Sequence, residues 1–76
     1  MKTYLTPKQI DIIQRLQNGW ELRASGFNDK FAMHHRSGTF IPDAISVMGL
    51  IKRGIIYEDV RFFYVLKDSN VTWSTP

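Results

Sequence analysis

The sequence predicts a small domain of the α+β class, and three observations lead to this prediction. Residues 6–18 and 42–53 repeat apolar side chains at the three- and four-residue spacing of helices. Residues 20–25 alternate apolar and polar side chains, and residues 55–66 concentrate strand-forming aromatic and aliphatic residues. The chain has 76 residues, of which 43% are hydrophobic and 13% aromatic, which is enough for one core. We therefore expect a single domain over residues 1–70.

The first helix is predicted over residues 6–18 by its boundary signals. Thr6 is a favourable N-cap, and Gln9 lies where it completes a capping box with Thr6. Pro7 suits the first helical position, and Gly19 can take the left-handed conformation that ends a helix. The apolar face is expected to carry Ile10, Ile13 and Leu16.

A central β-hairpin is predicted after this helix. Residues 20–25 and 30–35 both alternate, and residues 26–29 between them are turn formers. A short helix over residues 28–34 is an open alternative, because several residues there also tolerate a helix. Residues 36–40 contain a Ser-Gly pair and are expected to form a loop.

The second helix is predicted over residues 42–53. Pro42 suits its first turn, and Gly54 ends it. Apolar residues cover more than half of its circumference, so we expect it to be the central helix. The polar side is expected to face solvent and to carry Asp43, Ser46, Gly49 and Arg53.

The core is expected to combine one face of each helix with the strands. The residues expected to be mostly buried are Ile13, Leu16, Trp20, Ile45, Met48, Ile51, Ile55, Phe62 and Tyr64. Replacing Ile45 or Ile51 with alanine is then expected to cost about 2–5 kcal/mol, as for other buried isoleucines.

A second β-hairpin is predicted near the C-terminus. Residues 55–57 and 61–66 read as strands around a tight turn at Glu58 and Asp59. Residues 71–76 are expected to form a flexible tail, although Trp73 could dock on the domain.

Composition limits the classes of partner and compartment. Ten Lys and Arg residues against seven Asp and Glu residues give a net charge of +3, which permits binding to nucleic acid or another acidic partner. The chain has no cysteine, so disulfides and thiolate metal sites are excluded, in keeping with a reducing cytoplasm. It has neither the apolar run of a membrane span nor that of a signal peptide, and we expect a cytoplasmic protein without a membrane partner.

Catalytic and metal-binding motifs are not recognised in the sequence. His34 and His35 are adjacent on a predicted strand, so they should point to opposite faces and not share one metal ion. The serines lack the context of a nucleophile, and the glycines are too dispersed for a phosphate-binding loop. We expect no enzymatic activity, no cofactor and no bound metal.

Three segments together resemble winged-helix proteins of bacterial or phage type. They are Leu5-Thr6-x-x-Gln9, Leu50-Ile51-Lys52-Arg53-Gly54-Ile55-Ile56 and Phe63-Tyr64-Val65-Leu66-Lys67-Asp68. The resemblance implies two main helices with a central hairpin and a C-terminal β-hairpin wing. It also implies a small DNA-binding protein, either a transcriptional regulator or a phage accessory protein.

The second helix would be the recognition helix in such a DNA-binding protein. Ser46 and Gly49 are small enough for close approach to a duplex groove, and Lys52 and Arg53 could contact phosphates or bases. Further basic residues that could assist are Arg23, Lys30 and Arg36. A symmetric homodimer would double these contacts. The acidic turn predicted at Glu58 and Asp59 opposes phosphate binding by the wing.

The alternative function is that of a protein-interaction module, such as a phage-encoded modulator of a host protein. Aromatic residues that a short chain cannot bury completely would then form the binding surface, with Phe63 as one candidate. The two functions differ in their dependence on salt, because only DNA binding releases counterions from phosphates.

Overall fold

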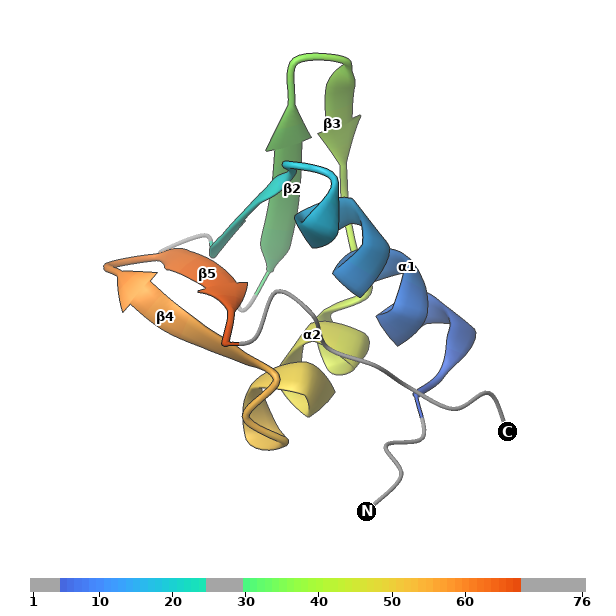
Figure 1. The fold of residues 1–76 in the computed structure, drawn as a ribbon, viewed down its shortest axis with the longest axis vertical. Coiled ribbons are helices and arrows are strands. Elements are labelled where there is room, and N and C mark those ends of the chain that lie inside the picture. Colours follow the sequence, from blue (N-terminus) through green and yellow to red (C-terminus); the bar gives the residue numbers. More distant parts are fainter. Residues whose placement is uncertain (1–4, 25–29, 68–76) are drawn as a thin grey trace.

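The computed structural model describes residues 5–24 and 30–67, and these form two helices and a five-stranded antiparallel sheet (Figure 1). The elements in chain order are α1 (Pro7–Gln17), β1 (Glu21–Ala24), β2 (Phe31–His35), β3 (Gly38–Phe40), α2 (Ala44–Lys52), β4 (Ile56–Val60) and β5 (Phe63–Leu66). The predicted α+β class is confirmed. Three strands lie between the two helices, so the order of elements differs from that of a typical winged helix.

Helix α1 begins and ends where its boundary signals predict. The N–H of Gln9 donates to Thr6 Oγ1 at 3.2 Å, and the N–H of Thr6 donates to Gln9 Oε1 at 3.1 Å. This capping box satisfies two backbone donors at the helix start. Gly19 follows the helix with a φ of 92°, a conformation that glycine adopts without strain. Ile12 and Ile13 are completely buried.

The sheet has the strand order β3-β2-β1-β5-β4, with β1 at its centre. Leu22 pairs with Met33 on β2 and with Tyr64 on β5, so these three side chains share one face of the sheet. This face and the buried sides of both helices form the core. Glu21 and Arg23 alternate with Leu22 and are exposed on the opposite face.

The central hairpin is confirmed in β1 and β2, while its turn, predicted over residues 26–29, lies outside the described residues. The alternative helix over residues 28–34 is wrong where it is described, because Phe31–His35 is a strand. The loop expected over residues 36–40 is confirmed only at residues 36 and 37, which form a turn. Its second half is strand β3, which pairs Phe40 with Met33 and adds an edge strand.

The second hairpin turns later than predicted. Strand β4 continues through Glu58 to Val60 with an irregularity between them, and the turn is formed by Arg61 and Phe62. Phe62 has a φ of 71°, and its N–H donates to a Glu58 carboxylate oxygen at 3.1 Å, which closes the turn. The tip therefore carries an arginine and a phenylalanine, and the predicted acidic tip at Glu58 and Asp59 is wrong.

The core agrees with the sequence prediction for α1 and differs for α2. Ile13 is completely buried, and the partly buried residues packed on the core include Leu16, Trp20, Ile51, Ile55 and Tyr64. Three residues predicted to be buried are exposed instead: Ile45 at 80%, Met48 at 54% and Phe62 at 40%. The side chains that replace them in the core include Val47, Leu50 and Ile56. Within the described part of the chain, neither helix is long and apolar enough to cross a membrane.

Candidate protein-binding surface

The side of α2 predicted to face solvent is partly turned to the protein interior, although Asp43 and Arg53 at its two ends are exposed as predicted. Ser46 is only 8% exposed, and Val47 and Leu50 on the same side are completely buried. The prediction of a solvent-facing Ser46 is therefore wrong. Asp43 precedes the helix as its N-cap and accepts hydrogen bonds from the N–H and Oγ of Ser46, at 3.1 and 3.0 Å. These bonds hold the Ser46 side chain beside the helix start.

A close approach between α1 and α2 explains this orientation. A Cβ atom at Gly49 would lie 2.7 Å from Gln9 Nε2, so any larger residue there would require the Gln9 amide to shift. The same Nε2 donates to the backbone oxygen of Ser46 at 3.5 Å. The small residues Ser46 and Gly49 thus accommodate helix α1, whereas the sequence analysis assigned them to a duplex groove.

The opposite side of α2 carries apolar side chains exposed to solvent. Ile41 is 66% exposed, Ile45 80% and Met48 54%. Ile45 and Met48 lie one helical turn apart and form a line on one side of α2; together with Ile41, in the segment that precedes the helix, we call them the α2 stripe. Lys52 continues the same line by four residues and is also exposed. The stripe exists because α2 is apolar on two sides and only one of them can face the core.

A surface hollow adjoins the α2 stripe at Met48. It is lined by Phe31, Met48, Gly49, Ile51, Lys52 and Tyr64. Phe31 and Tyr64 meet edge to face, with ring centroids 5.8 Å apart, and these rings belong to the sheet. The hollow therefore joins the exposed helix face to the inner face of the sheet and extends the apolar surface beyond the stripe.

The basic residues proposed to contact DNA on α2 differ from Ser46 and Gly49 in exposure. Lys52 and Arg53 are exposed at the C-terminal end of the helix, whereas Ser46 is buried and Gly49 adjoins Gln9. The two cations are therefore accessible to a partner, while Ser46 is not.

The basic residues proposed in the sheet are also dispersed. Arg23 donates to a Glu21 carboxylate oxygen at 2.7 Å, and its guanidinium lies 4.7 Å from the centre of the Phe63 ring. Lys30 precedes strand β2, and Arg36 lies in the turn that follows it. A strand of five residues spans roughly 17 Å, so these two cations lie at opposite ends of β2.

An aromatic and cationic cluster joins α1 to the β2–β3 hairpin. The Arg15 guanidinium lies between two rings, 4.7 Å from the centre of Trp20 and 3.8 Å from that of Phe40. His35 stacks on Trp20 with centroids 5.0 Å apart. These side chains are thereby engaged with one another in a structural role. His34 is the next residue back along the strand and lies 3.5 Å from Thr39 Oγ1, so the two histidines point to opposite faces as strand geometry predicted.

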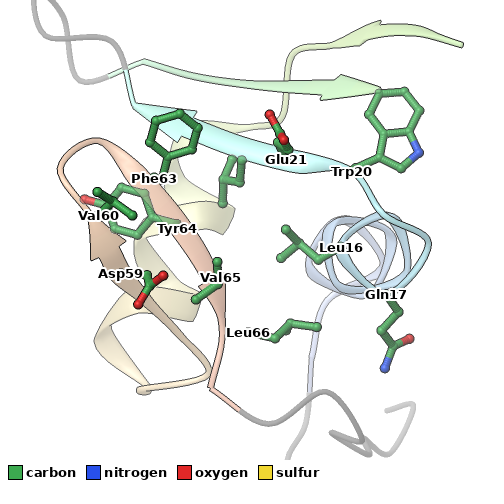
Figure 2. A pocket seen from close by; sticks show the side chains of 11 residues that line it. Leu16, Gln17, Trp20, Glu21, Asp59, Val60, Phe63, Tyr64, Val65 and Leu66 are labelled. Carbon is green, nitrogen blue, oxygen red and sulfur yellow. The ribbon is translucent and has the colours of Figure 1, made fainter. Parts of the chain in front are cut away.

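A groove lies between the C-terminal half of α1 and strand β5 (Figure 2). It lies beside the pairing of β1 with β5 at Leu22–Tyr64. Leu16 lines it from the α1 side and Val65 and Leu66 from the β5 side, while Glu21 and Asp59 lie at its edge. Among its apolar side chains Val60 is 61% exposed and the others are at most partly exposed, whereas Ile45 of the α2 stripe reaches 80%.

The sequence contained one signal for the α2 stripe that the sequence analysis did not use. A helix that is apolar over more than half of its circumference cannot be buried on all sides by a chain of 76 residues. Some apolar side chains of α2 had to stay exposed. Comparison of the chain with protein-family models, curated proteins and solved structures gives no match.

Proposed function

We propose that this chain is a protein-binding module and that the α2 stripe is its binding surface. The observation that carries this proposal is that three large apolar side chains are each more than half exposed: Ile45 and Met48 on one side of α2, and Ile41 just before the helix. Single exposed apolar residues are common on soluble proteins, but several along one helix and the segment leading into it are typical of a surface that another protein covers.

The spacing of the α2 stripe fits a known mode of recognition. An amphipathic helix that binds a hydrophobic groove or another helix presents anchors at positions i, i+4 and i+7. Within α2, Ile45 and Met48 have the i, i+3 spacing of such anchors, and Ile45, the most exposed, would be the main one. Methionine adapts its shape to an irregular partner surface, so Met48 suits the edge of such a contact.

Duplex DNA is a less suitable partner for this surface. Affinity for DNA comes mainly from contacts between cations and phosphates, and an isoleucine that is 80% exposed gains little from a phosphate-lined groove. The segment from α2 through the β4–β5 hairpin is the part that resembles a winged helix. We propose that this chain uses a similar scaffold to bind protein. We therefore propose a cytoplasmic protein that modulates a partner protein by covering one of the partner's surfaces.

The proposal is tested by photo-cross-linking in cells. A photoreactive amino acid in place of Ile45 is expected to form covalent adducts with protein, and the added substitution Met48→Lys should abolish them. The matched control carries the same photoreactive group in place of Gln14, an exposed polar residue of α1. Equal cross-linking from both positions would contradict the proposal. Salt-sensitive retention of duplex DNA that Lys52→Glu abolishes and Ile45→Lys preserves would favour the DNA-binding alternative.

A further inference from the structure

We infer that the partner of the α2 stripe is an acidic protein segment, which places an apolar side chain in the hollow beside Met48 and carboxylates on the cations where α2 ends. This inference rests on the proposed function and names the chemistry of the partner. It is carried by three features of the described residues: a cluster of cations, the apolar hollows that adjoin it, and the spacing between the two.

Three basic residues meet at the C-terminal end of α2. Lys52 lies in the last turn of the helix, and Arg53 is its C-cap. The N–H of Lys67, just after β5, donates to the backbone oxygen of Ile55 at 3.0 Å, which brings Lys67 beside the residues that follow the helix. All three basic residues are exposed. We call Lys52, Arg53 and Lys67 the basic corner.

The basic corner has an excess of positive charge. Within the part of the chain that the structure describes, neither Lys52 nor Lys67 forms an ion pair. Asp43 lies at the opposite end of α2. Glu58 is nearer, but its carboxylate accepts the N–H of Phe62 at 3.1 Å and closes the β4–β5 turn. The two lysines therefore attract carboxylates that a partner supplies.

The hollow beside Met48 provides the apolar part of the contact. Phe31 and Tyr64 line it with two rings that meet edge to face, and Lys52 belongs to the same lining. Lys52 follows Met48 by four residues, so both lie on one side of α2. An apolar side chain that enters this hollow is thus brought next to a cation.

A second hollow repeats this combination on the other side of Tyr64 in the lining. Ile56 and Lys67 line it, and it shares Ile51 and Tyr64 with the first hollow. The two hollows are therefore neighbours, and each has one lysine in its lining. A single segment that crosses both would meet a cation in each of them.

The spacing between the apolar and cationic groups predicts the pattern in the partner. Met48 and Lys52 are four residues apart in α2, which is about 6 Å along the helix axis. An extended segment covers about this distance in two residues, and a helix covers it in about four. We therefore expect the partner to carry Asp or Glu two residues from its apolar anchor if it is extended, and three or four if it is helical.

An acidic protein segment suits this surface better than a nucleic acid does. Nucleic acids carry phosphates along their whole length, and their affinity comes from a track of cations. The basic corner has its three cations at one end of α2, and the exposed side chains that lead away from it along the helix are Met48 and Ile45. A protein segment can combine apolar anchors with one or two carboxylates, which matches this arrangement.

The inference is tested by selecting binders to the full chain from a library of random peptides displayed on phage. We expect the enriched peptides to carry net negative charge, with Asp or Glu at the predicted distance from an apolar residue. Fluorescence polarisation then measures the affinity of a labelled enriched peptide. Lys52→Glu combined with Lys67→Glu should weaken binding at least tenfold at low salt, and added salt should narrow this difference because it screens the charges.

The matched control is Lys8→Glu combined with Arg36→Glu, which changes the net charge equally at exposed positions on other elements. It should alter the affinity no more than twofold, and equal weakening by both double variants would overturn the inference. So would the absence of enrichment, or enriched peptides that are neutral or basic. Displacement of the peptide by a mixed-sequence DNA oligonucleotide that needs the same two lysines would assign the basic corner to phosphates. Protein cross-linking from position 45 that is unchanged by the Lys52→Glu and Lys67→Glu pair would overturn the inference and leave the proposed function intact.

Discussion

The two helices of this protein begin with the same kind of cap and yet treat their apolar side chains differently. Helix α1 buries Ile12 and Ile13 completely and turns its polar residues outward. Helix α2 buries Val47 and Leu50 but leaves Ile45 and Met48 more than half exposed. The difference teaches that a cap fixes where a helix begins, whereas its rotation about its own axis depends on what it packs against.

The polar residues of α1 allow this helix only one rotation about its own axis. Its apolar stripe is narrow, so turning the helix would bury charged groups without partners, at a cost of several kcal/mol by the usual estimates for ions. Helix α2 has apolar residues on two sides, so burial of apolar area favours either side to a similar extent. The contact of Gly49 with Gln9 of α1 then distinguishes the two sides, because it allows the closest approach.

The largest effect is expected from matched truncations on the two sides of α2. Leu50→Ala should reduce the free energy of unfolding by about 2–5 kcal/mol, because this side chain is completely buried. Ile45→Ala should change it by no more than about 0.5 kcal/mol, as for other surface positions. Urea unfolding of the monomer followed by circular dichroism measures both. A larger loss for Ile45→Ala than for Leu50→Ala would show that α2 has the opposite rotation.

An intermediate effect is expected where the two helices meet. Gly49→Val should reduce the free energy of unfolding by about 1–3 kcal/mol, the usual cost of overpacking, because its side chain would collide with Gln9. Gln9 cannot move away freely, since its other polar atom belongs to the capping box with Thr6. Met48→Val is the control for the effect of a β-branched residue in the same helix. If Gly49→Val leaves the free energy of unfolding unchanged or increases it, the contact between Gly49 and Gln9 does not explain the rotation of α2.

The smallest effect is expected on the partly exposed side of α1. Arg15→Ala should cost about 1–2 kcal/mol, because it removes two cation–π contacts, with Trp20 and with Phe40. Asp11→Asn removes only the ion pair with Arg15 and should cost about 0.5 kcal/mol or less. Thermal unfolding compares the two variants. An equal loss in both would assign the stabilisation to the ion pair and not to the rings.

Much of the fold could be predicted from local patterns, and the errors share a cause. The capping box of Thr6 and Gln9 and the alternation around Leu22 predicted α1 and β1 correctly, because each depends on neighbours within a few residues. Strand β3 was missed because a three-residue strand has too short an alternation to recognise. The turn at Arg61 and Phe62 was missed because it is closed by a Glu58 side chain and places a phenylalanine at positive φ.

The candidate binding surface shows the same difference between what local sequence patterns predict and what tertiary packing decides. The sequence showed that Ser46 and Gly49 are small and lie together on one side of a helix, which correctly indicated that another group approaches closely there. It did not show that the group is Gln9, because residues 9 and 49 are brought together only by the packing of α1 on α2. The exposed side was therefore assigned to the wrong residues, and Ile45 was placed in the core.

The sequence by itself determined the class of the fold, the start of α1 and the two strands of the central hairpin, because caps, glycines and alternation act through local hydrogen bonds and side-chain direction. Only the tertiary structure decided which side of α2 is buried. Local patterns cannot make that choice, because the two sides are similarly apolar and differ in how closely α1 can approach them. The exposed α2 stripe, on which the proposed function rests, is a consequence of that choice.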